Sequence, residues 1–153
     1  MLHRISAGVL CERDDRILLL HNFKLDVYDF WVAPGGGAEG VEDLHATAQR
    51  ETFEECGLIV QPLKLAYVEE LIWADSSTRQ CKFWFTACVT GGQFNLNQNP
   101  SSGENIVAAM WLSREEICSK NVFPPVLCHD YWADKLNDFV TPKYVGVRQM
   151  TVD

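Results

Sequence analysis

The segment from Gly36 to Leu58 constrains this chain more than any other, because it combines a helical pattern with an unfavourable cluster of charge. It reads GGAEGVEDLHATAQRETFEECGL, and Glu51, Glu54 and Glu55 are spaced to share one face of a helix. That helix would end at the following glycine, a residue type that commonly terminates helices. Carboxylates in a last turn oppose the helix dipole by about 0.3–1 kcal/mol each when exposed. Such a break of a local rule tends to mark a functional site, and a divalent cation would turn the repulsion into attraction.

Length and composition indicate a single domain over residues 1–153. Hydrophobic residues make up 47% of the chain and charged residues 22%, as in soluble globular proteins. The formal net charge of −8 disfavours non-specific binding to nucleic acid or to an anionic membrane, so neither is expected as a partner. An acidic protein that handles an acidic substrate would need a metal ion between them.

The cysteines indicate a reducing compartment. All six lie outside any CxxC pair and outside zinc-ligand spacing with the histidines, so we expect reduced thiols. The sequence shows no signal peptide and no run of 18 apolar residues. The predicted location is therefore the cytoplasm.

Apolar runs separated by turn residues predict more strands than helices. The expected elements are strands at Ser6–Cys11, Ile17–His21, Asp29–Ala33, Ile59–Trp73, Gln80–Val89 and Ile106–Leu112, and a helix over Asp43–Cys56. Ser113 and Glu116 have the spacing of a capping box that opens a short helix. Pro124-Pro125 is expected to begin another helix over Val126–Phe139, and residues from Thr141 onward are unassigned. This order predicts an α+β fold with a mixed sheet and helices on both sides.

The spacing within the glutamate-rich segment resembles the signature of the Nudix hydrolases, the MutT-like pyrophosphohydrolases. That signature is glycine, five residues, glutamate, seven residues, Arg-Glu, an aliphatic-type residue, any residue, Glu-Glu, any residue, glycine and an aliphatic residue. Its fixed positions are all matched, by Gly36, Glu42, Arg50, Glu51, Glu54, Glu55 and Gly57. Thr52 fills the first aliphatic slot. At about 7% usage per residue type, a chance match is roughly 10⁻⁸ per start position. The resemblance covers about Ser6 to Phe139 and implies a Nudix-type α/β/α sandwich.

The resemblance also implies a metal site. Glu54 and Glu55 are the expected ligands of Mg²⁺, with Mn²⁺ as an alternative ion. Glu51 is expected as a further ligand or as the base for the attacking water, and Gly35 as a ligand through its carbonyl. Arg50 would hold a carboxylate in place with its planar guanidinium. The expected catalytic residues are thus Glu51, Arg50 and Glu54. Magnesium favours oxygen ligands, and such ions neutralise phosphate charge and activate water.

Carboxylates outside the last helical turn have expected roles as well. Glu42 is expected to brace the loop and the helix rather than to bind metal. Family members often take one more metal ligand from a later loop, and Glu104 is the candidate here. Glu69, Glu70 and Asp75 are its rivals.

The activity that the resemblance implies is metal-dependent hydrolysis of a pyrophosphate bond, with water attacking phosphorus. The substrate would be a nucleoside diphosphate linked to another moiety, such as a nucleoside triphosphate or a nucleotide sugar. A small-molecule nucleotide is thus the expected partner, and a homodimer is left open. Phe123-Pro124-Pro125 resembles a MutT segment in which a following asparagine reads oxidised guanine, but Leu127 stands at that place, which speaks against this specificity. The alternative is a non-catalytic Nudix-fold module that senses a nucleotide, although such modules tend to lose glutamates that this chain keeps.

Overall fold

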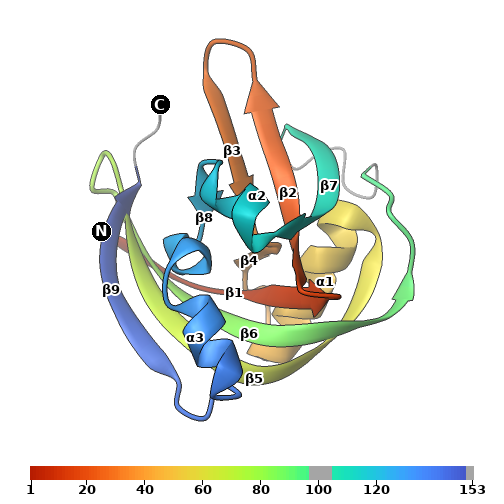
Figure 1. Ribbon diagram of the computed structural model, residues 1–153. Coiled ribbons are helices and arrows are strands. Elements are labelled where there is room, and N and C mark those ends of the chain that lie inside the picture. The colour runs from red at the N-terminus through yellow and green to blue at the C-terminus, as the bar shows by residue number, and fades with distance from the viewer. Residues whose placement is uncertain (97–104, 151–153) are drawn as a thin grey trace.

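The computed structural model describes residues 1–96 and 105–150. Its strands follow the order β8-β3-β2-β1-β6-β5-β9 in one curled sheet, with β4 paired to β1 and β7 paired to β2 (Figure 1). The strands are β1 (Leu2–Arg13), β2 (Arg16–Lys24), β3 (Tyr28–Val32), β4 (Gly35–Gly37), β5 (Leu58–Trp73), β6 (Thr78–Gly92), β7 (Ile106–Ser113), β8 (Val122–Phe123) and β9 (Lys143–Met150). The helices are α1 (Leu44–Cys56), α2 (Arg114–Cys118), the 3-10 helix η1 (Pro125–Cys128) and α3 (Tyr131–Leu136). Within the described ranges, no helix has the length and apolar character needed to cross a membrane.

Strand β1 joins the two halves of the sheet. Over Leu2–Cys11 it pairs in parallel with β6, and its last two residues pair antiparallel with the start of β2. Its other edge pairs antiparallel with the short strand β4, where Ser6 lies opposite Gly37 and Gly8 lies opposite Gly35. The glycine segment is therefore held against the centre of the sheet by backbone pairing.

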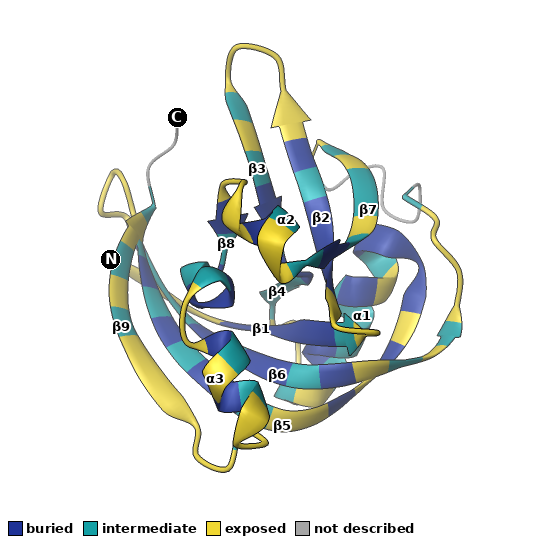
Figure 2. Cartoon of the chain, viewed as in Figure 1, coloured by how far each residue is buried: buried dark blue, intermediate teal, exposed yellow. Residues whose placement is uncertain are grey.

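Buried residues alternate with exposed ones along several strands (Figure 2), and the buried side chains form two clusters on opposite faces of the sheet. Trp84 and Phe85 are neighbours in β6 but belong to different clusters, because successive side chains of a strand point to opposite faces. Ala48 of α1 packs in the cluster of Phe85, whereas Leu127 of η1 and Tyr131 of α3 pack in the cluster of Trp84. Helices thus cover both faces, and the expected mixed sheet between helices is confirmed.

Helix α1 has strong signals at both ends. Asp43 caps its start, since the side chain accepts a hydrogen bond of 2.8 Å from the Ala46 amide. Gly57 ends it in the left-handed conformation with φ 83°, and its N–H donates to the carbonyl of Phe53 at 2.8 Å. A Cβ on Gly57 would lie 2.4 Å from the carbonyl oxygen of Gln93, so glycine is required there for space as well as for φ. The expected helix and its end at Cys56 agree with the structure.

The second predicted helix is wrong as a continuous element. Residues 126–139 divide into η1 and α3, because His129 leaves the helical conformation with φ −127° and ψ −100°. The Trp132 indole donates to the carbonyl of Leu127 at 2.9 Å, so a side chain satisfies a group that a continuous helix would pair through its backbone. The capping box of Ser113 and Glu116, in contrast, is present at the start of α2.

The residues left unassigned after Thr141 contain strand β9, which pairs in parallel with β5 at the edge of the sheet. A buried polar network fastens β9 to α3. The Tyr67 hydroxyl donates to the Asp134 carboxylate at 2.5 Å, and Lys143 of β9 forms an ion pair with the same carboxylate. Burial tends to raise the pKa of Asp134, but the hydrogen bonds from Lys143 and Tyr67 outweigh it and leave the pKa below its ordinary value.

Candidate metal and substrate site

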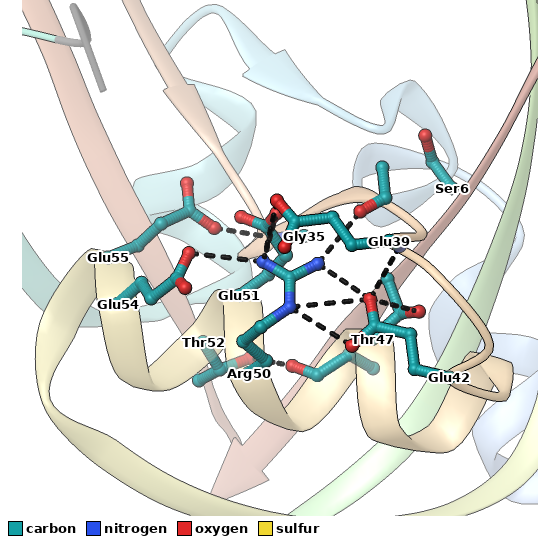
Figure 3. A network of polar contacts seen from close by, with 12 residues as sticks. Ser6, Gly35, Glu39, Glu42, Thr47, Arg50, Glu51, Thr52, Glu54 and Glu55 are labelled. Atoms are coloured by element: carbon teal, nitrogen blue, oxygen red, sulfur yellow. Dashed lines mark hydrogen bonds and ion pairs between the residues drawn. The ribbon is translucent and has the colours of Figure 1, made fainter. Parts of the chain in front are cut away.

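The three glutamates of the last turn of α1 lie close to one another, as their spacing predicts (Figure 3). We call Glu51, Glu54 and Glu55 the carboxylate cluster. Arg50 holds two of its members through one nitrogen: Nη1 lies 2.9 Å from Oε1 of Glu51 and 3.1 Å from Oε2 of Glu54. The i,i+4 contact to Glu54 is the one expected from the sequence, whereas the contact to the adjacent Glu51 is an addition.

Arg50 also connects α1 to the loop before it. Its Nη2 lies 2.7 Å from Oε1 of Glu42 and donates to the carbonyl of Gly37 at 2.8 Å. The same Glu42 carboxylate accepts from the Glu39 amide at 2.8 Å and from the Thr47 hydroxyl at 3.0 Å. The hydrogen bond from Arg50 is the main cause that lowers the pKa of Glu42 to about 2. Glu42 is therefore engaged in bracing the loop and the helix, in agreement with the role expected of it.

The glycine strand β4 contacts the other side of the cluster. The Gly35 amide donates to Oε1 of Glu55 at 2.8 Å, and the Glu55 side chain is buried. Gly36 makes room for Glu51, because a Cβ on residue 36 would lie 2.4 Å from the Glu51 carboxyl carbon. Gly35 thus contacts the cluster through its N–H, and the metal contact proposed for its carbonyl stays a prediction.

The charge of this region fits a hard cation. Carboxylates of Glu42, Glu51 and Glu54 surround the guanidinium of Arg50, and Glu55 lies beside them on the Gly35 amide. With Lys82 as the other nearby cation, these four carboxylates still leave an excess of negative charge. Carboxylate oxygens are the ligands that Mg²⁺ favours. In the parts of the chain that the structure describes, no three Asp, Glu, His or Cys side chains gather around one point, since Arg50 and Gly35 hold these carboxylates apart. The donor set fits the metal, and binding requires the side chains to turn toward it.

A cavity of about 460 Å³ opens beside the carboxylate cluster. Its size is within the range of small-molecule sites. The cavity is lined by Arg4, Asn22, Tyr28, Phe30, Val32, Ala33, Gly35, Gly36, Gly37, Glu51, Glu55, Gln80 and Lys82. Reasoning from the sequence missed Arg4, Lys82 and the aromatic pair Tyr28 and Phe30. The available signal was Lys82 itself, a charged residue within a strand whose two faces both carry large side chains.

Lys82 is buried, and its ammonium lies 4.3 Å from the centroid of the Trp84 ring. Burial is the main cause that lowers the pKa of Lys82, while the nearby charges of Glu55, Glu69 and Glu51 act in the opposite direction. The cavity therefore contains a buried cation close to the carboxylate cluster.

The candidates for an additional metal ligand lie in different places. Glu104 lies outside the described residues, so its proposed contact stays a prediction. Glu69 is buried and accepts a hydrogen bond from the Trp84 indole at 3.0 Å. It lines a second cavity together with residues of η1. Glu70 pairs with Arg79 at 3.2 Å, and Asp75 accepts from the Ser77 amide in the turn between β5 and β6. Each of these three rivals is thus engaged in a contact with a residue other than the carboxylate cluster.

Comparisons with known proteins agree with this geometry. The NUDIX domain model matches residues 1–130. A relative from Danio rerio named 8-oxo-dGDP phosphatase NUDT18 is 29% identical over 111 residues, which cover 72% of this chain and 32% of that protein. The Homo sapiens protein of the same name is 30% identical over 126 residues, or 82% of this chain and 35% of that protein. A solved NUDIX hydrolase from Nitrosomonas europaea has a TM-score of 0.71 and 26% identity, covering 86% of this chain and 90% of that one.

The fold, the site and the match to the NUDIX domain over most of the chain together define the family of this protein. The chain belongs to the NUDIX family, which confirms the resemblance inferred from its glutamate spacing. It spans about a third of the length of the NUDT18 relatives that it matches.

Proposed function

We propose that this chain hydrolyses a pyrophosphate bond with the help of a divalent cation, Mg²⁺ or Mn²⁺. The observation that supports this most strongly is the carboxylate cluster at the cavity wall, where these carboxylates and Glu42 outnumber the nearby cations Arg50 and Lys82. A purely structural network would be expected to balance its charges, because unpaired like charges destabilise a fold. The excess at this position is consistent with a site that receives a cation and an anionic substrate.

Each residue of the cluster has a proposed role. Glu54 and Glu55 hold the cation through their carboxylates, and Gly35 adds its carbonyl. Arg50 keeps Glu51 and Glu54 oriented from one side, since its Nη1 contacts both. Glu51, packed against Gly36, is a further ligand or accepts the proton of the attacking water. When bound, the cation supplies charge neutralisation for the phosphates and an activated water molecule.

The proposed substrate is a small nucleotide in the cytoplasm, a nucleoside diphosphate linked to another moiety. Two relatives are named as phosphatases of 8-oxo-dGDP, itself a nucleoside with a phosphoanhydride. Tyr28 and Phe30 give the cavity aromatic surface and Asn22 gives it an amide, as suits a nucleoside. Selectivity for oxidised guanine is not part of the proposal, because Leu127 is fully buried in the core and has no polar group to offer a base.

A panel of nucleoside triphosphates, dinucleotides and nucleotide sugars, incubated with and without Mg²⁺, tests the proposal. Released phosphate is read after phosphatase treatment, and the reaction in ¹⁸O-labelled water shows which phosphorus is attacked. Turnover that requires the metal and is lost in Glu54→Gln is the expected result. Tight nucleotide binding without turnover by the metal-loaded wild type would instead support the sensing module and contradict the proposal.

A further inference from the structure

Strands β1 and β6 place four polar side chains on one patch of the sheet beside the carboxylate cluster. The strands run in parallel, with Arg4 opposite Gln80 and Ser6 opposite Lys82. Because side chains two residues apart share a face of a strand, all four point the same way. The Gln80 side-chain amide donates to the Ser6 hydroxyl, and Arg4, Gln80 and Lys82 line the cavity. The patch therefore presents two cations to the cavity, from backbone positions that are about 6–7 Å apart along the strands.

Arg4 differs from the arginines that serve the fold. Arg16 and Arg79 form ion pairs of 2.8 and 3.2 Å with glutamates, whereas Arg4 makes no hydrogen bond or ion pair with any residue in the described ranges. Its Nη2 lies 2.8 Å from the place that a Cβ on Gly37 would take, so the guanidinium rests on the glycine backbone at the rim of the cavity. The donors of Arg4 are thus available to a ligand in the cavity.

Lys82 supplies the inner cation of the patch. It is buried, although a lysine is rarely buried without an anionic partner nearby. Its anionic neighbours are Glu55 and Glu51 of the carboxylate cluster and Glu69, which accepts from the Trp84 indole at 3.0 Å and faces Arg148 at 3.5 Å. A phosphate bound in the cavity would contact Lys82 on its buried side and Arg4 at the rim.

We propose that Arg4 and Lys82 bind a phosphate group of the substrate other than the two phosphates joined by the hydrolysed bond. This inference rests on the proposed function, in which the carboxylate cluster and its cation engage the phosphates that are separated. Once the cation draws Glu51 and Glu55 toward itself, Lys82 and Arg4, which is unpaired within the described ranges, are left on the β1–β6 wall to receive another anionic group. The site therefore selects nucleoside triphosphates over nucleotide sugars, whose neutral hydroxyls offer no charge to the patch.

Equilibrium binding separates this inference from the catalytic proposal. The probes are a methylene-bridged nucleoside triphosphate and a methylene-bridged nucleotide sugar, which carry the same nucleoside and are not hydrolysed at the bridge. Calorimetric titration with Mg²⁺ compares the wild type with Arg4→Gln and Lys82→Met, and with the matched control Arg13→Gln. Arg13 stands on the same strand but over the ring of Trp111, away from the cavity.

Arg4→Gln is expected to weaken binding of the triphosphate analogue about tenfold while changing binding of the nucleotide-sugar analogue less than about twofold. Lys82→Met should show the same selectivity with a larger loss, and Lys82→Arg should restore part of it if the methionine variant melts early. Arg13→Gln should bind both analogues as the wild type does. Equal losses for both analogues, or no loss in Arg4→Gln, would overturn the inference. If the wild type hydrolyses its substrate but Arg4→Gln binds the triphosphate analogue normally, only this inference is overturned. If Arg4→Gln binds the analogue weakly but the wild type hydrolyses nothing, only the catalytic proposal is overturned.

Discussion

Two polar networks lie on opposite faces of the sheet and differ in how their charges balance. On one face Asp134 receives the ammonium of Lys143 and the hydroxyl of Tyr67, so one anion meets one cation and one neutral donor. On the other face Arg50 contacts the carboxylates of Glu42, Glu51 and Glu54, and Glu55 accepts a hydrogen bond from the Gly35 amide (Figure 3). The first network is electrically complete, and the second has negative charge in excess.

From this difference we infer that the first network serves the fold, whereas the second is the one proposed to serve a ligand. A balanced buried network fixes one arrangement of its elements, here β9 against α3, and loses stability when one partner is removed. An unbalanced network is stabilised by an added cation. Removing one of its carboxylates should therefore change the free energy of unfolding little and reduce turnover strongly. The two networks therefore predict opposite outcomes for the same kind of substitution.

The largest expected effect is on turnover. Glu54→Gln or Glu55→Gln should reduce kcat on the order of 10³-fold, because each removes one charged oxygen ligand of the cation. Thermal melts of the metal-free variants should stay near the wild type, since the loss of a contact to Arg50 or Gly35 is offset by relief of repulsion. A glutamine variant with near-normal turnover would show that the cluster is not the metal site.

The next effect concerns stability in the presence of metal. Adding Mg²⁺ at 100 times its dissociation constant should stabilise the wild type by about 2.7 kcal/mol, because the ion binds only the folded state. For a chain of this size the melting temperature would rise by about 8 °C. Glu54→Gln should lose most of this rise while Asp134→Asn keeps it, and an equal rise in both variants would contradict the distinction between the networks.

A smaller effect is expected from the balanced network. Asp134→Asn should lower the free energy of unfolding by about 1–2 kcal/mol, since the buried Tyr67 hydroxyl and Lys143 lose a charged acceptor. Urea titration measures the loss, and Tyr67→Phe provides the matched change at the other end of the hydrogen bond. Turnover at a temperature where both proteins are folded should stay within about twofold of the wild type. A loss of kcat comparable to that of Glu54→Gln would show that this network belongs to the site.

The smallest effect is a dependence on acid. Arg50 lowers the pKa of Glu42 from 4.5 to about 2 in the folded protein, so the contribution of this carboxylate is fully present above pH 4.5 and is lost as the pH falls toward 2. The difference in unfolding free energy between wild type and Glu42→Gln should therefore be constant near neutral pH and shrink between pH 4.5 and 2. Urea titrations across this range measure it. A difference that grows on acidification would have the wrong sign for a lowered pKa.

The features that the sequence predicted correctly depend on residues close together in the chain. The helix over Asp43–Cys56 and its end at Gly57 follow from local caps, and the carboxylate cluster follows from the spacing of glutamates within one turn. The break at His129 could not be read in this way, because it depends on how Trp132 packs back on Leu127 in the folded protein.

Features set by long-range pairing were missed for a related reason. Strand β9 is an edge strand whose Tyr144 and Val147 stay exposed, so its sequence carries little of the alternation that marks a half-buried strand. The cationic patch forms only when β1 pairs with β6, and the hydrogen-bonded residues Ser6 and Gln80 are 74 positions apart. Neither Arg4 nor Lys82 has a neighbour in the chain that would mark it as part of a site.

The contact between Gly36 and Glu51 has a consequence for how this family can change over evolution. Because the Glu51 carboxyl carbon occupies the space where any other residue 36 would place its Cβ, the identity of residue 36 and the conformation of Glu51 are inherited together. A single codon change at position 36 would displace Glu51 while leaving every glutamate of the signature in place. Such a lineage would keep the appearance of a hydrolase in its acidic residues and lose the arrangement that lets them act. On the proposed mechanism, one substitution at this glycine would therefore be enough to disable the site without changing any glutamate of the signature.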